Sequence, residues 1–129
     1  MLLLVDNGSV FTKNIVEFLE SNNVSHQAIP FDRANLDDLD RFDSIILSGR
    51  RHNDQAMNAL NSKLINRSIL QKKPLLGICY GAEILALTAG GTIRKMSSVQ
   101  KGPSTVQVMQ KNPLCSGVIQ VYQSHSYEI

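Results

Sequence analysis

The chain has 129 residues, which is enough for one domain with a buried core. Apolar residues make up 43% of the chain and charged residues 19%, proportions that are ordinary for a soluble globular protein. The net charge of +2 is too small to indicate nucleic acid or a membrane surface as a ligand, so neither is expected as a partner.

The first third of the chain alternates apolar runs with helical patterns. Residues 1–6 (MLLLVD) form a continuous apolar run, which predicts a strand buried on both faces of a parallel sheet. After the turn DNGS, residues 11–23 place apolar side chains at helical spacing and end in Asn-Asn, which predicts a helix. We expect a second strand at residues 24–30, a short helix or turn at 31–42 and a third strand at 43–49.

The rest of the chain continues this alternation and then changes character. Residues 50–73 predict a loop followed by a helix, 73–79 (KPLLGIC) a fourth strand, and 81–91 a helix that stops at Gly-Gly. Residues 104–110 and 118–129 alternate apolar and polar side chains, as half-exposed antiparallel strands do. The order of elements therefore predicts an α/β fold, a doubly wound, mostly parallel sheet with an antiparallel C-terminal hairpin.

The ends of the chain and its cysteines indicate the compartment. The N-terminal apolar run is too short for a membrane span and lacks the basic region of a signal peptide, so a cytoplasmic location is expected. In that reducing compartment no disulfide is expected between Cys79 and Cys115. Cys115 lies in the turn-rich segment KNPLCSG and is interpreted as a shielded loop thiol.

Three loops are expected to meet at one edge of the predicted sheet. In open α/β sheets, ligands bind outside the carboxyl ends of the parallel strands. The residues that follow these ends are Asn7-Gly8, Ser48-Gly49-Arg50 and Cys79-Tyr80-Gly81. This edge is therefore the candidate site.

Residues 77–81 (GICYG) have the form of a nucleophile elbow at a sharp strand-to-helix turn. Such a turn strains the backbone of Cys79, and side chains at Gly77 or Gly81 would collide across it. The N-terminus of the following helix is expected to lower the pKa of the thiol. A buried structural cysteine is the alternative, but the position at the sheet edge favours a nucleophile. The backbone N–H groups of Tyr80 and of the Gly49–Arg50 peptide are the candidate oxyanion donors.

The general base cannot be assigned from the histidines alone. His26 begins a strand far from the carboxyl edge, and His52 lies in a polar loop. A triad of Cys79, His125 and Glu128 would need residues three apart on one strand to face the same side, which a regular strand does not allow.

The segment GICYGAEILALTAGG resembles the nucleophile segment of the class I, triad-type glutamine amidotransferases. Three other segments also match the family in position. The family's first loop and helix correspond to DNGSVFTKNIVEFL, its oxyanion strand to IILSG, and its late substrate-side loop to VYQSHSYEI. The late segment and Tyr80 are most similar to the glutaminase subunit of archaeal GMP synthases. The N-terminal segment also resembles the glutaminase component of anthranilate or aminodeoxychorismate synthases.

The resemblance implies a flavodoxin-like fold and a specific reaction. Cys79 would attack the side-chain amide of L-glutamine and form a γ-glutamyl thioester, with no cofactor and no metal. Ammonia would pass to an ATP-dependent synthase partner (an ATP pyrophosphatase), most similar to the one that makes GMP from XMP, and water would release glutamate. Gly49, Arg50 and Tyr80 would form the oxyanion hole. The bound glutamine would lie near Glu83, Ser124 and His125.

Three departures from the family pattern qualify this implication. Family members usually carry His-Gln where this chain has Ala82-Glu83, and Gly-Gly-Pro where Arg50-Arg51 follow Gly49. The family's catalytic His and Glu lie in an H-x-E motif beyond the late loop, and no H-x-E occurs in this sequence. Residues 1–129 are therefore expected to be a single amidotransferase domain that is incomplete at its C-terminus and has little glutaminase activity alone.

Three functional hypotheses follow from these residues. The first is a glutaminase that supplies ammonia to a synthase. The second is a catalytically impaired relative that binds or regulates a synthase, which Glu83, Arg50 and the missing H-x-E favour and the intact GICYG disfavours. The third is another hydrolase, such as a peptidase, with the same elbow cysteine.

Overall fold

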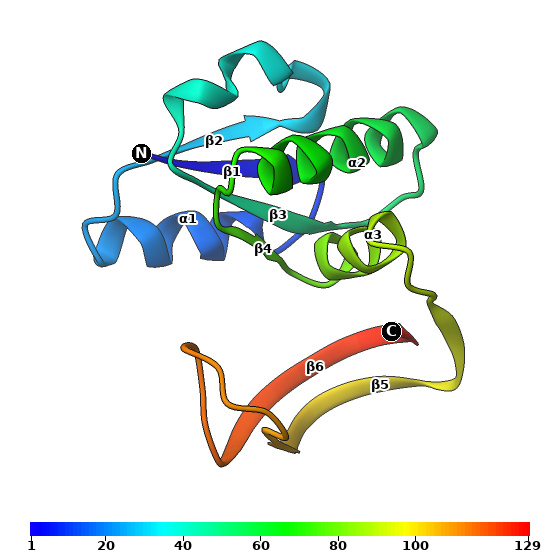
Figure 1. The fold of residues 1–129 in the computed structure, drawn as a ribbon. Helices are drawn as coiled ribbons and strands as arrows, with labels where there is room; N and C mark the ends of the chain where they lie inside the picture. Colours follow the sequence, from blue (N-terminus) through cyan, green and yellow to red (C-terminus); the bar gives the residue numbers. More distant parts are fainter. The chain divides into compact units, whose positions relative to one another are not determined.

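The computed structural model describes all 129 residues, which divide into two compact units, residues 1–92 and 93–129 (Figure 1). The first unit is a parallel α/β layer structure and the second is an antiparallel strand pair. The predicted fold class is therefore confirmed. None of the helices combines the length and the apolar character needed to cross a bilayer.

The first unit is built on a four-stranded parallel sheet with the order β2-β1-β3-β4 (Figure 1). The strands are β1 (Leu2–Asn7), β2 (His26–Pro30), β3 (Ser44–Arg50) and β4 (Leu75–Gly77). The two central strands, β1 and β3, are the longest apolar runs, and both of their faces are covered. This burial explains why their sequences do not alternate between apolar and polar residues.

Helices cover the two faces of this sheet. The helices are α1 (Thr12–Ser21), α2 (Gln55–Leu70) and α3 (Tyr80–Thr88). Alternate side chains of the central strands separate into two clusters, as the period of two in a strand requires. One cluster joins Leu3, Val5, Ile45 and Leu47 to residues of α2 and α3. The other joins Leu4 and Ile46 to Leu19 of α1.

The segment predicted as a short helix or turn is two short 3-10 helices, η1 (Phe31–Arg33) and η2 (Leu36–Arg41). Leu39 is fully buried, and it anchors η2 to the sheet together with Phe42. The Lys73 ammonium donates to the carbonyl oxygens of Leu39 (2.5 Å) and Phe42 (2.6 Å) at the end of this segment. The Leu39 carbonyl oxygen also accepts the Phe42 backbone N–H (3.1 Å), so Lys73 adds a second hydrogen bond there and connects the end of η2 to the segment before β4.

The second unit is an antiparallel pair of β5 (Arg94–Gln107) and β6 (Val118–Glu128). The predicted C-terminal hairpin is confirmed, but β5 begins ten residues earlier than its alternating pattern at residue 104 indicated. Gly102-Pro103 interrupts the pattern, and the register shifts between Lys95 and Gln100, so the first part of β5 has no regular period. An irregular strand of this kind cannot be predicted from the alternation of apolar and polar residues.

Candidate active site

Cys79 lies between β4 and the first residue of α3, in the position of the helix N-cap. Its backbone has φ 53° and ψ −113°, a left-handed conformation that is rare for a residue with a side chain. Strain of this kind persists only where the surrounding structure enforces it, and it gathers at functional sites. The strained turn expected from GICYG is present.

The turn requires glycine at two positions, because a methyl group at either position would overlap the backbone that faces it. A Cβ on Gly77 would lie 2.5 Å from the backbone nitrogen of Ala82 and would overlap the carbonyl group of Gly81. A Cβ on Gly81 would lie 2.9 Å from Cβ of Leu47 and would overlap the Leu47 carbonyl oxygen. The collision predicted across the turn is confirmed, and it extends to β3.

The loops after β1 and β3 approach Cys79 closely. A Cβ on Gly49 would lie 3.5 Å from Cβ of Cys79 and 3.3 Å from Oγ of Ser9. The pairing of β1 with β3 continues through Asn7 and Arg50, and an isolated bridge joins Gly8 to Arg50. The three loops that were expected to share one sheet edge therefore meet there.

The pKa of the Cys79 thiol is raised above its ordinary value, and the largest cause is desolvation by partial burial. The backbone N–H of Tyr80 opposes this rise in pKa, the Glu83 carboxylate adds to it, and the Arg50 guanidinium opposes it. The lowered pKa expected from the helix N-terminus is therefore wrong for the free thiol, because desolvation outweighs the one N–H that reaches the sulfur. The residue itself is exposed at the surface, so reagents can reach it.

A buried amide network secures the ends of β1 and β3 behind this edge. The side-chain amide of Asn7 donates to the carbonyl oxygen of Ser48 (3.2 Å), and the Asn7 backbone N–H donates to Ser48 Oγ (2.9 Å). Asn61 of α2 donates to Asn7 Oδ1 (2.8 Å) and to the carbonyl oxygen of Met57 (2.9 Å). Asn7, Ser48 and Asn61 are each at most 1% exposed, so these bonds replace water entirely.

The side chain of Arg50 lies at the centre of a second polar cluster at this edge. The partners of Arg50 were not predicted from the sequence. The guanidinium lies over the Tyr80 ring, with Cζ 4.1 Å from the centroid. Nη1 donates to Oδ1 of Asn53 (2.7 Å) and of Asn58 (2.9 Å). The sequence signal that bears on this cluster is Asn58 and Asn61 inside α2, because asparagine is uncommon inside a helix unless its side chain has a partner.

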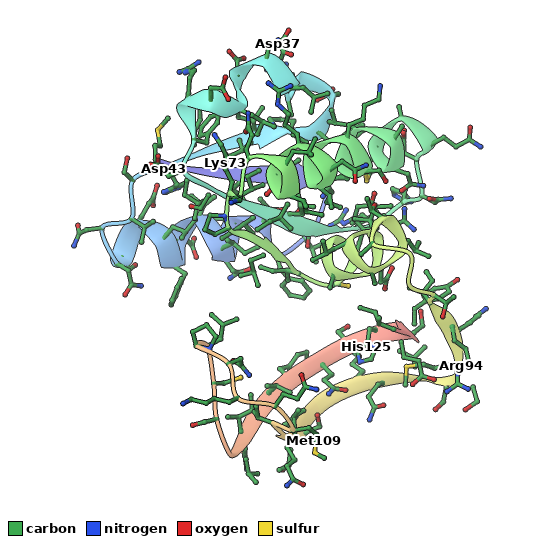
Figure 2. The ribbon with its side chains drawn as sticks, in the orientation of Figure 1. Asp37, Asp43, Lys73, Arg94, Met109 and His125 are labelled. Carbon is green, nitrogen blue, oxygen red and sulfur yellow. The ribbon has the colours of Figure 1, made fainter.

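The other residues implied by the resemblance occupy separate units. Glu83 lies in the first turn of α3, whereas Ser124 and His125 lie on β6 of the second unit. Figure 2 shows His125 on β6, where Nδ1 is 2.7 Å from the Tyr127 carbonyl oxygen and Nε2 is 3.2 Å from Gln123 Oε1.

Glu128 bonds with Arg94 and not with His125. Nε of Arg94 donates to Glu128 Oε1 at 2.7 Å, and the two side chains form an ion pair across the strand pair. This pairing agrees with the expectation that residues three apart on β6 cannot act as a histidine and its orienting carboxylate.

Neither of the remaining histidines is hydrogen-bonded to the thiol, and no metal cluster is present. Nδ1 of His26 donates to the Val24 carbonyl oxygen at 2.8 Å, and His52 is exposed in the loop before α2. No group of three or more His, Cys, Asp and Glu side chains is arranged to hold a metal ion.

Comparison with known proteins gives a consistent result over nearly the whole chain. Residues 3–129 match the family model for glutamine amidotransferase class-I. The chain is 31% identical to one subunit of the glutamine-hydrolyzing GMP synthase of Thermoplasma acidophilum, over 99% of this chain and 65% of that protein. It is 30% identical to the glutamine-hydrolyzing GMP synthase of Flavobacterium psychrophilum, over 99% of this chain and 25% of that protein.

The fold is similar to that of solved structures as well. A crystal structure of a GMP synthase subunit from Thermoplasma acidophilum superposes with a TM-score of 0.82 at 27% identity. The superposition covers 98% of this chain and 65% of that chain. The chain therefore spans just under two thirds of the Thermoplasma relative and a quarter of the longer synthase.

Proposed function

Since the chain belongs to the class I glutamine amidotransferase family, we propose that it carries the nucleophile of the glutaminase reaction, in which L-glutamine is hydrolysed to glutamate and ammonia through a thioester on Cys79. We propose that residues 1–129 alone complete this reaction slowly, because they contain no H-x-E motif to supply the general base. The observation that carries this proposal is the backbone of Cys79. Its φ of 53° at a strand-to-helix turn, with a glycine two residues before it and another two residues after it and with the end of β3 against it, matches what a presented nucleophile needs.

The proposed chemistry has two stages. The thiolate of Cys79 attacks the side-chain amide carbon of glutamine, and the amide oxygen takes the negative charge of a tetrahedral intermediate. The backbone N–H groups of Tyr80 and Arg50 stabilise that charge, with Gly49 leaving room for it. The leaving nitrogen takes a proton from solvent water, the carbon–nitrogen bond breaks, and ammonia departs. Water then attacks the thioester, which releases glutamate and regenerates the thiol of Cys79.

Binding of the substrate is proposed to involve three further residues. Glu83 carries a carboxylate in the first turn of α3 that would pair with the α-ammonium group of glutamine. Ser124 and His125 are proposed as substrate residues on the family resemblance. The Glu83 carboxylate also raises the pKa of Cys79, so its neutralisation by an ammonium group would favour the thiolate when substrate binds.

The ammonia is proposed to serve a synthase. Both relatives described above are GMP synthases, so the proposed acceptor is XMP and the proposed partner is the ATP-dependent synthase component. This support is similarity alone, whereas the proposal for Cys79 also rests on local geometry.

Labelling with a glutamine-like chloroketone tests the function. We expect one label per chain, on Cys79, and we expect excess L-glutamine to prevent it. The Cys115→Ser variant is the matched control and should be labelled as the wild type is, because Cys115 lies in the loop after β5. Peptide mass spectrometry identifies the modified thiol.

Two other outcomes would contradict the proposal in different ways. Labelling of Cys79 that glutamine does not prevent would indicate a hydrolase with another substrate. Absence of labelling would indicate a protein that keeps the fold for binding or regulation.

A further inference from the structure

The side chains of Arg50 and Tyr80 are joined through one acceptor. Asn58 Oδ1 accepts from Nη1 of Arg50 (2.9 Å) and from the hydroxyl of Tyr80 (2.7 Å). The guanidinium also lies over the Tyr80 ring, 4.1 Å from its centroid. Asn53 closes the cluster, because its Oδ1 accepts from Arg50 (2.7 Å) and from Asn58 Nδ2 (3.1 Å).

This cluster connects two elements that the proposed reaction needs at a fixed spacing. Arg50 is the last residue of β3, and Tyr80 is the first residue of α3. Their backbone N–H groups are the two proposed oxyanion donors. Tyr80 is 3% exposed, so its ring cannot move without opening the core around it.

We propose that Arg50 is a positioning residue whose guanidinium, held by Asn58 and stacked on Tyr80, fixes the spacing between the end of β3 and the start of α3. The role rests on the proposed function, because its purpose is to hold two oxyanion donors. Only a planar guanidinium can stack on a ring and donate in its own plane at the same time, so lysine cannot replace it.

The physical basis is the sensitivity of oxyanion stabilisation to geometry. Donors act only within hydrogen-bond distance of the developing charge, and a displacement of about 1 Å can cost about a hundredfold in rate. The residue after Gly49 is Arg50 and not a second glycine, so side-chain contacts are available here to restrain the backbone. The hydrogen bonds of Asn58 and Asn53 go to Arg50, Tyr80 and each other, so their effect on reactivity would pass through those two residues.

A test of this role must distinguish the effect of the Arg50 charge from the effect of its side-chain geometry. Its positive charge opposes the rise in the pKa of Cys79, so removing the charge would change thiol reactivity for an unrelated reason. Arg50→Lys keeps the charge and loses the stacked, forked contact. Asn58→Ala keeps Arg50 itself and removes the shared acceptor. Arg51→Lys is the matched control, because Arg51 is the exposed neighbour outside the cluster.

The experiment compares two reagents on the same thiol. The glutamine-like chloroketone needs its carbonyl oxygen held, whereas iodoacetamide needs only an accessible thiolate. For Arg50→Lys and Asn58→Ala we expect the maximal rate of inactivation by the chloroketone to fall about tenfold or more. We expect the iodoacetamide rate and its pH profile to stay unchanged. Arg51→Lys should match the wild type with both reagents.

Each outcome has a distinct meaning. A loss of rate with both reagents would show general damage to the site and would overturn the positioning role. Unchanged chloroketone rates in both variants, with glutamine-protected labelling of the wild type, would overturn the role and leave the proposed function standing. A wild-type chain without glutamine-protected labelling would overturn the proposed function and the positioning role together.

Discussion

Replacing Gly81 with alanine is expected to lower the free energy of unfolding of the first unit by about 3 kcal/mol or more. The new methyl group would lie 2.9 Å from Cβ of Leu47 and would overlap the carbonyl oxygen of Leu47. That oxygen already accepts the backbone N–H of Ile78 at 2.9 Å, so β3 cannot move away without losing this bond. Alanine favours a helix over glycine by about 1 kcal/mol, which is too little to offset the overlap.

Urea unfolding followed by circular dichroism measures this effect, and the midpoint should fall while the slope stays constant. Gly49→Ala is the matched control. The closest contact of its methyl group would be Oγ of Ser9 at 3.3 Å, so a shift of the Ser9 side chain would at most weaken the exposed hydrogen bond that it accepts from the backbone N–H of Phe11 (3.1 Å). A Gly81→Ala chain as stable as the wild type would show that α3 does not pack against β3 as described.

Replacing Asn61 with alanine is expected to destabilise the chain by about 2–3 kcal/mol, because it leaves a buried acceptor without its donor. Asn61 donates to Oδ1 of Asn7 at 2.8 Å, and both side chains are at most 1% exposed. A water molecule that entered the space left by the amide would recover only part of this hydrogen bonding, because its immobilisation costs entropy. The ends of β1 and β3 beside Cys79 would loosen, so the site should be affected together with stability.

A double-mutant cycle separates this pairing from the effect of simply shortening the side chain. Removing Asn7 and Asn61 together should cost less than the sum of the two single changes, because the second change removes a group that the first left unpaired. Asn66→Ala on the exposed face of α2 is the control and should change stability by no more than about 0.5 kcal/mol. Additive effects at Asn7 and Asn61 would contradict the network.

Most of the fold could be predicted from the sequence because its strongest signals are local. The apolar runs of β1 and β3 exist because both faces of these strands are buried, and the spacing of apolar residues marks α1 and α2 directly. The prediction failed in β5, where Gly102-Pro103 and a register shift remove the alternation that marks a strand. There the partner strand decides the structure and the local sequence does not.

Part of the candidate site could likewise be predicted from the sequence, and part could not. The strained turn at Cys79 and the close contacts of Gly77 and Gly81 follow from a five-residue motif. The clusters around Asn58 and Asn61 could not be predicted, because their partners lie up to 54 residues away in the sequence. The position of an asparagine in the sequence does not indicate which distant residue it will bond with. The direction of the pKa shift of Cys79 also required the structure, since desolvation depends on packing that motifs do not encode.

The central claim is that the thiol of Cys79 attacks the side-chain amide of glutamine, and intact-mass spectrometry after acid quenching tests it most directly. A single acylation suffices, so slow hydrolysis of the thioester would only increase the signal. We predict that incubation with L-glutamine adds one γ-glutamyl group per chain, that fragmentation places it on Cys79, and that hydroxylamine removes it. A chain that keeps its unmodified mass, or that carries the group on Cys115, would contradict the claim.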